Sequence, residues 1–196
     1  MRARGRQTMR TLLDAGAEVF AERGYHAARV DDIVTRAETS HGTFYLYFSN
    51  KEELFRALAV DVAAAIVELG EALPPITADG AGEQRLRDWL DRFADLYERN
   101  RSTLQAWTEA EIGDSVFGRL GDDVFAELSR VVATRVRASA PDDIDPVTAG
   151  LAVVAMIERL HYYAATGQVR ISREETVGTL ASVTHDAIFG NTTPRR

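Results

Sequence analysis

The sequence predicts an all-α fold of nine helices. Apolar residues recur at intervals of three and four along most of the 196 residues, which is the period of an amphipathic helix. No window shows the sustained alternation between turn residues that marks a β-strand. A hydrophobic content of 45% is enough to bury a proper core, in one large domain or in a small domain joined to a medium one.

Three helices are expected within the first 50 residues. Met9, Leu13 and Phe20 lie on one face of the first helix, which Gly24 is expected to end. Residues 30–37 repeat this spacing in a second helix.

Residues 39–51 indicate a short third helix, a tight turn and the start of a fourth helix. Phe44 and Phe48 are four positions apart and share one helical face, which turns Gly42 and Leu46 to the opposite side. The phenylalanines are expected to anchor this helix while its other face stays available for a ligand. This arrangement is typical of a helix-turn-helix element that reads DNA.

The remaining helices follow from caps and apolar stripes. Ser49 to Glu52 form a capping box that begins a long fourth helix, and Pro74 lies just beyond its end. A loop is expected up to Gly82, followed by helices over residues 86–97, 104–112 and 120–131. Asp145-Pro146, and a second capping box at residues 172–175, open the last two helices.

The chain resembles the TetR family of transcriptional regulators. The resemblance is carried by Phe20-Ala21-Glu22-Arg23-Gly24-Tyr25, by Gly42-Thr43-Phe44-Tyr45-Leu46-Tyr47-Phe48 and by Asn50-Lys51-Glu52-Glu53-Leu54-Phe55. It implies a three-helix DNA-binding domain over residues 1–50, followed by a ligand-binding and dimerisation domain over residues 51–196. It also implies a repressor that a small molecule releases from its operator.

The resemblance also implies which residues contact double-stranded DNA. Those expected at or near the major groove are Thr39, Ser40, His41, Gly42, Thr43 and Tyr45. Tyr45 and His41 are the expected base readers, although packing of Tyr45 in the core is an alternative. Tyr47, Lys51 and Arg29 are expected to bind DNA phosphates. Lys51 is expected to gain no local stabilisation, because a cation opposes the dipole at a helix N-terminus.

Charge is distributed unevenly along the chain. The net charge is −7, yet residues 1–51 hold eight basic and six acidic side chains, against 15 basic and 24 acidic in the remainder. A basic N-terminal segment followed by an acidic remainder orients the molecule, because DNA phosphates attract the first and repel the second. A flexible arm of Arg2, Arg4 and Arg6 is expected to enter a minor groove, although a purely solubilising tail is an alternative.

Two positions depart from the family pattern. Glu38 stands in the turn before the third helix where glycine is common, and tolerating a left-handed conformation there would cost about 1–2 kcal/mol. Ala28 stands where the second helix usually has a Thr or Ser cap, which leaves the amide groups of that helix start to water or to another group.

The penultimate helix is apolar on every side over residues 149–157. A helix of this kind must be covered on two sides. Its own core can cover one face, and the final helix together with a second copy of the chain can cover the other, so we expect a homodimer through the last two helices. One buried core helix in a monomer is the alternative.

A small, apolar effector is expected to bind in the helical body. The candidate lining consists of large apolar side chains on helices that enclose the effector in proteins of the family, and these are Trp89, Phe93, Tyr97, Leu104, Trp107, Phe117 and Met156. Glu109, Glu111, His161 and Tyr162 are candidate polar contacts. Each aromatic residue is equally compatible with an ordinary place in the core.

Other protein classes find little support. The chain has no cysteine, its four histidines lack paired metal-ligand spacing, and no nucleophile elbow or phosphate-binding glycine loop is present. We therefore expect neither an enzyme nor a bound metal or cofactor. No apolar run approaches the ~18 residues of a membrane span, and no apolar segment follows Arg6 as in a signal peptide, so we expect a cytoplasmic protein. A helical bundle that binds only protein is the alternative function.

Overall fold

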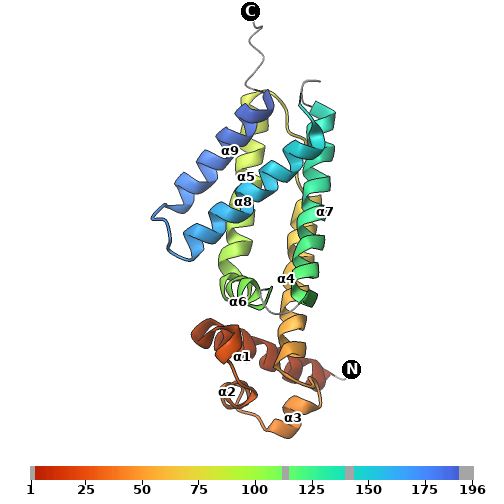
Figure 1. The fold of residues 1–196 in the computed structure, drawn as a ribbon, viewed down its shortest axis with the longest axis vertical. Helices are drawn as coiled ribbons and strands as arrows, with labels where there is room; N and C mark the ends of the chain where they lie inside the picture. The colour runs from red at the N-terminus through yellow and green to blue at the C-terminus, as the bar shows by residue number, and fades with distance from the viewer. Residues whose placement is uncertain (1–2, 112–114, 140–143, 190–196) are drawn as a thin grey trace, which may run out of the picture. The chain divides into compact units, whose positions relative to one another are not determined.

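The computed structural model describes residues 3–111, 115–139 and 144–189 (Figure 1). Within these residues the chain forms nine α-helices and no β-strand, which confirms the predicted fold class. The helices are α1 (Ala3–Ala27), α2 (Val30–Arg36), α3 (His41–Tyr45), α4 (Lys51–Glu71), α5 (Gly80–Arg99), α6 (Arg101–Glu111), α7 (Ser115–Ser139), α8 (Pro146–Ala165) and α9 (Arg173–Phe189).

The chain divides into two compact units. The first unit comprises Met1–Ala64 and Asn100–Gly121, and the second comprises Ala65–Arg99 and Asp122–Arg196. α4 therefore contributes residues 51–64 to the first unit and residues 65–71 to the second. The first unit includes α6, which packs on α1 although it is distant in sequence. A functional boundary at residue 50 stays a prediction, because compactness does not report function.

An aromatic cluster forms the core of the first unit. The ring of Phe55 lies 5.0 Å from Phe20, 4.9 Å from Tyr25 and 5.1 Å from Phe117, measured between ring centroids. Offset and edge-on ring pairs of this kind add stability beyond the area that they bury. The cluster thus ties α1, α4 and the start of α7 together within this unit.

One expectation about α1 is confirmed and another needs correction. Gly24 ends the regular helix as predicted, because its backbone is non-helical with φ 75° and ψ 166°, and a further helical piece runs to Ala27 after this kink. The break leaves the Tyr25 amide outside the helical pattern, and this amide donates to Glu109 Oε2 at 2.8 Å. The helix also begins at Ala3 and includes Arg4 and Arg6, because no proline interrupts the helix-forming residues there. These two arginines are therefore not a flexible arm, and Arg2 lies outside the described residues.

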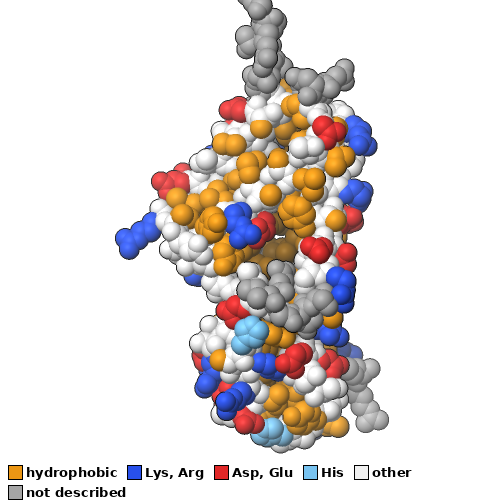
Figure 2. Space-filling model, in the orientation of Figure 1, with side chains coloured by type: hydrophobic (Ala, Val, Ile, Leu, Met, Phe, Trp, Pro, Cys, Tyr) orange, Lys and Arg blue, Asp and Glu red, His pale blue; other side chains and the backbone are white. Residues whose placement is uncertain are grey.

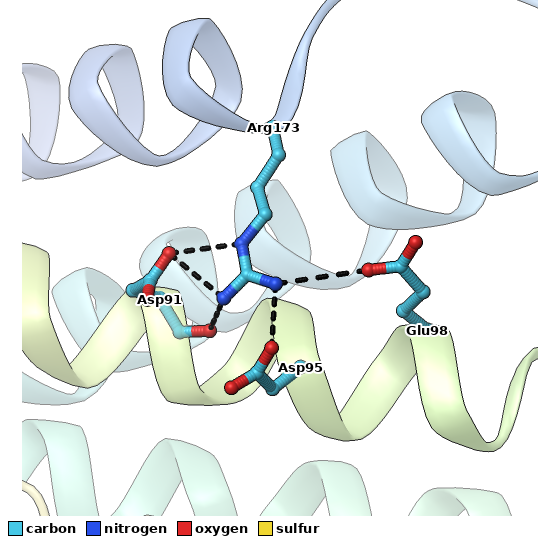
Figure 3. A network of polar contacts seen from close by, with 4 residues as sticks. All are labelled: Asp91, Asp95, Glu98 and Arg173. Atoms are coloured by element: carbon cyan, nitrogen blue, oxygen red, sulfur yellow. Dashed lines mark hydrogen bonds and ion pairs between the residues drawn. The ribbon is translucent and has the colours of Figure 1, made fainter.

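The second unit is a helical body in which α5, α8 and α9 pack on one another (Figure 1). α7 approaches α8 closely at Gly150, where an added Cβ would lie 2.5 Å from the Ser129 carbonyl oxygen. α9 is fastened to α5 by Arg173, whose guanidinium donates to Asp91 Oδ1 at 2.9 Å and also reaches Asp95 (Figure 3). These exposed ion pairs contribute little energy but fix how α9 lies on α5.

Capping side chains begin α4, α8 and α9. Asp145 Oδ1 accepts from the Thr148 amide at 2.8 Å ahead of the proline that opens α8, as predicted. The predicted box before α9 is confirmed, since Glu175 accepts from the Ser172 amide at 2.8 Å. The box before α4 is displaced by one residue from the prediction. Asn50 caps the Glu53 amide at 2.8 Å and Glu53 accepts from the Ser49 amide at 2.6 Å, because Asn50 is the residue directly before the helix.

Candidate DNA-binding and effector sites

The third helix presents one buried and one exposed face. Phe44 and Phe48 are buried, as their spacing predicts, whereas the Tyr45 side chain is 57% exposed and Leu46 is 81% exposed. Ser40 Oγ accepts from the Thr43 amide at 3.1 Å and fixes the start of the helix. Exposure of Tyr45 removes the alternative in which it packs in the core. Leu46 was missed as a site residue, although its place opposite the phenylalanines signalled its exposure.

The turn before α3 has the strained backbone that the sequence suggested. Glu38 adopts φ 50° in the left-handed region, which costs about 1–2 kcal/mol for a residue with a Cβ atom. The start of α2 differs from the expectation, because Arg29 and not Ala28 is the N-terminal cap. The Arg29 amide donates to Asp32 Oδ2 at 3.2 Å, and Ala28 is buried.

The nine residues expected to contact DNA differ in their exposure and in their local contacts. Among these nine residues, the exposed ones are Arg29, Ser40, His41, Gly42 and Tyr45, and the half-buried ones are Thr39, Thr43, Tyr47 and Lys51. His41 Nε2 lies 2.6 Å from Asp31 Oδ1, so base reading by this ring requires that contact to open. A methyl group at Gly42 would meet only Ser40 Oγ, at 3.7 Å, which leaves its backbone open to a ligand.

Lys51 has local partners, which makes the expectation of no local gain wrong. Its Nζ donates to the carbonyl oxygens of Tyr25 at 2.8 Å, His26 at 3.1 Å and Ala28 at 3.0 Å. The ammonium also lies 5.1 Å from the centroid of the Tyr25 ring. These bonds use all three N–H donors and place a cation at the C-terminal end of α1, where the helix dipole favours it. Its expected role in phosphate binding stays a prediction.

Ion pairs hold α2 on α1. Arg36 donates to Glu18 at 2.7 Å and to Glu22 at 2.6 Å, and Arg23 lies 3.1 Å from Asp32. The bond from Arg36 lowers the pKa of the Glu22 carboxyl. Several acidic side chains of the first unit are thus neutralised by arginines, which moderates their repulsion of phosphates.

The expected effector residues fall into both units. Leu104, Trp107 and Phe117 belong to the first unit, and Trp89, Phe93, Tyr97 and Met156 belong to the second. Trp107 and Phe117 are buried, and the Trp107 indole donates to the Phe117 carbonyl at 3.1 Å. Phe117 also packs in the aromatic cluster, so these two residues stabilise the core of the first unit. Joint binding of one effector by all seven residues stays a prediction.

The candidate polar contacts have diverse surroundings. Glu109 accepts from the Tyr25 amide, and the Arg159 guanidinium lies 5.3 Å from the Tyr162 ring centroid. The side chain of Glu111 lies outside the described residues. His161 is buried against Phe93 and Tyr97 on the second unit, with its ring centroid 5.1 Å and 5.7 Å from theirs. Burial also raises the pKa of the Tyr97 hydroxyl, which keeps it protonated.

An apolar strip is exposed on the last two helices. Val147, Leu151, Ala155 and Tyr163 are exposed at intervals of four or eight along α8, and Val183 is exposed on α9. Figure 2 shows apolar side chains gathered over this part of the second unit. Arg159 interrupts the strip between Ala155 and Tyr163. Scattered apolar residues are normal on a protein surface, but a row of them along one helix face favours a partner.

The described residues contain neither a metal site nor a membrane-spanning helix. No group of three or more His, Asp or Glu side chains there is placed to hold a metal ion. None of the described helices combines the length and the apolar character that a membrane crossing requires.

A family model described as bacterial regulatory proteins, tetR family, matches residues 12–58. This match covers α1 from residue 12, all of α2 and α3, and the start of α4. Residues 12–58 therefore match the DNA-binding segment of the TetR family. The N-terminal helices of the chain accordingly form a helix-turn-helix of the type found in those bacterial regulatory proteins.

Individual relatives agree with this assignment. The chain is 38% identical over 73 residues to the HTH-type transcriptional regulator YdgC of Bacillus subtilis, which is 37% of either chain. It is 26% identical to the A-factor receptor protein of Streptomyces griseus, over 98% of this chain and 69% of that protein. A TetR-like transcriptional regulator from Rhodococcus sp. RHA1 shares the fold with a TM-score of 0.74 at 24% identity, over 97% of this chain and 99% of that one.

Proposed function

We propose that the protein is a repressor that binds a palindromic operator as a homodimer and is released by a small, largely apolar effector. The observation that carries DNA reading is the outward face of α3. Tyr45 is exposed there, while Phe44 and Phe48 anchor the same short helix in the core. Because the helix is anchored in the core, the exposed tyrosine is held in a fixed position from which it can contact bases in a DNA groove.

A substitution at Tyr45 tests base recognition separately from folding. Tyr45→Ala should relax base preference at defined operator positions by about 1–3 kcal/mol while leaving the free energy of unfolding nearly unchanged. Val60→Ala, which truncates an exposed side chain of α4, is the control and should keep the base preference. Fluorescence anisotropy with the DNA upstream of the gene measures both variants. Equal base preference in all three proteins would refute base reading by Tyr45, and no sequence-dependent binding in any of them would favour the helical bundle that binds only protein.

The homodimer is supported by the exposed strip of α8 and α9. A second copy would cover Val147, Leu151 and Val183, and a two-fold symmetric pair would place two reading helices on half-sites about 10 bp apart or a multiple of that. We infer that the dimer acts in the cytoplasm, because it can bind operator DNA there.

A charge placed in the strip tests this interface. Leu151→Glu should convert the dimer into a monomer in sedimentation and weaken operator binding, because the carboxylate would be desolvated between the copies. Val60→Glu alters an exposed valine of α4 and should leave the dimer intact. A monomeric wild-type protein at micromolar concentration, or footprints without dyad symmetry, would refute the proposal.

Release by an effector requires coupling between the two units. α4 is one continuous helix that contributes residues to both, so an effector that shifts it would alter the reading heads. Linkage then requires DNA to weaken effector binding by the same factor as the effector weakens DNA binding, with a coupling of about 1–3 kcal/mol.

A further inference from the structure

Three buried side-chain atoms of the second unit have no hydrogen-bond partner among the described residues, and His161 Nε2 is the one ring nitrogen among them. His161 lies on α8 and is only 6% exposed. Its Nε2 makes no hydrogen bond with any residue that the structure describes. An unsatisfied buried polar atom costs about 1–3 kcal/mol, so a position of this kind calls for an explanation.

The other ring nitrogen fixes what Nε2 can do. Nδ1 lies 2.7 Å from the carbonyl oxygen of Ile157, and a carbonyl only accepts, so Nδ1 carries the proton. Burial lowers the pKa of His161, which keeps the ring neutral at pH 7. In a neutral imidazole with Nδ1 protonated, Nε2 presents a lone pair and can only accept.

The surroundings of this lone pair are aromatic. The Phe93 ring is edge-on to the imidazole, the Tyr97 ring is tilted against it, and Trp89 lies 5.9 Å from Phe93 between centroids. Aromatic rings can pack on a flat or apolar ligand, and one polar atom among them would fix its orientation.

We propose that His161 Nε2 accepts a hydrogen bond from the effector, which is an uncharged, largely apolar molecule carrying a hydroxyl or N–H group. The inference rests on the proposed function and names the chemistry of its effector. An ionised carboxylate is unsuitable, because it offers only acceptor oxygens to a lone pair and would lose its hydration among aromatic rings. A ligand with a single donor satisfies the orphan atom and keeps its apolar body against the rings of Phe93 and Tyr97.

Two probe molecules test whether the ligand must donate a hydrogen bond to His161 Nε2. 2-Naphthol has a hydroxyl, and 2-methoxynaphthalene keeps the same rings and oxygen but cannot donate. Calorimetry on the full chain should give about tenfold tighter binding of 2-naphthol, the value of one hydrogen bond that is otherwise left unmade. In His161→Phe, which keeps a ring of similar shape, the ratio of the two affinities should fall to about one.

His185→Phe is the matched control. His185 is also buried on the second unit, but its Nε2 already bonds the Thr77 carbonyl oxygen at 3.0 Å. This variant should retain the tenfold preference. An equal preference in wild-type protein and His161→Phe, or no saturable binding of either probe, overturns the proposal.

If His161→Phe does not fold, the proposed hydrogen bond can be tested on the wild-type protein alone. The ¹⁵N signal of His161 Nε2 should move on addition of 2-naphthol and stay in place with the methyl ether, and an unmoved signal with both overturns the proposal. Operator affinity without any probe is measured on the same samples. Failure of operator binding counts against the proposed function, whereas failure of the 2-naphthol preference with intact operator binding counts against His161 alone.

Discussion

Lys51 offers the sharpest test of how the reading head is held in place. Lys51→Met keeps a long apolar stem and removes the ammonium that bridges three carbonyls at the end of α1. The Tyr25 and Ala28 bonds are partly buried, and each carbonyl left without a partner costs roughly 1–3 kcal/mol, whereas the exposed His26 carbonyl can return to water. We expect the free energy of unfolding to fall by about 2–4 kcal/mol.

The two tryptophans allow this loss to be assigned to one unit. Trp107 belongs to the first unit and Trp89 to the second, so a Trp89→Phe background leaves a single reporter beside the affected core. Urea unfolding followed by Trp107 fluorescence measures the change. Arg10→Met removes an exposed positive charge from the same unit and is the control. An equal effect of the two substitutions would refute the internal role of Lys51.

The same variant separates folding from phosphate binding. A lysine that holds a phosphate should, when removed, flatten the slope of log affinity against log salt by about one unit per subunit. The three donors of Lys51 are occupied within the protein, so a slope that changes little while stability falls would assign the ammonium to internal bonding alone. A flatter slope with unchanged stability would instead support the phosphate contact.

Three further predictions concern backbone strain and protonation. Glu38→Gly should raise the free energy of unfolding by up to about 1 kcal/mol in urea titrations, since glycine relieves the left-handed φ but adds freedom to the unfolded chain. Gly24→Ala should lower it by about 2–3 kcal/mol in the same assay, because φ is 75° and an added Cβ would lie 2.8 Å from Glu109 Oε2. Burial lowers the pKa of His161 in the folded protein, so the unfolded chain binds this proton more tightly. Stability should therefore fall between pH 7 and pH 5, and His161→Phe should flatten that dependence; an unchanged dependence in the variant would assign the loss to other groups.

Local sequence was sufficient for the helices and for the outline of the reading head. The caps at Asp145 and Ser172 and the burial of Phe44 and Phe48 were predicted correctly, because each depends on residues within one or two helical turns. The strained turn at Glu38 was also foreseen, since only a few residue types adopt a positive φ without cost. The motif that carries the family resemblance is local in the same sense.

The tertiary structure decided which partners meet. Lys51 bonds a carbonyl 26 positions away and Glu109 bonds an amide 84 positions away, and neither pairing has a signature in the local pattern. The expected effector residues likewise divided between two units, because helical periodicity marks a face as buried without naming what covers it.

The sequence by itself thus determined the elements, the caps of α8 and α9 and the exposed face of the reading helix, all of which follow from interactions over a few residues. Only the tertiary structure gave Lys51 its three acceptors, placed Phe117 in the aromatic core and left one nitrogen of His161 without a partner. These outcomes depend on packing between distant segments, where burial and geometry set the free energy and sequence spacing carries no information.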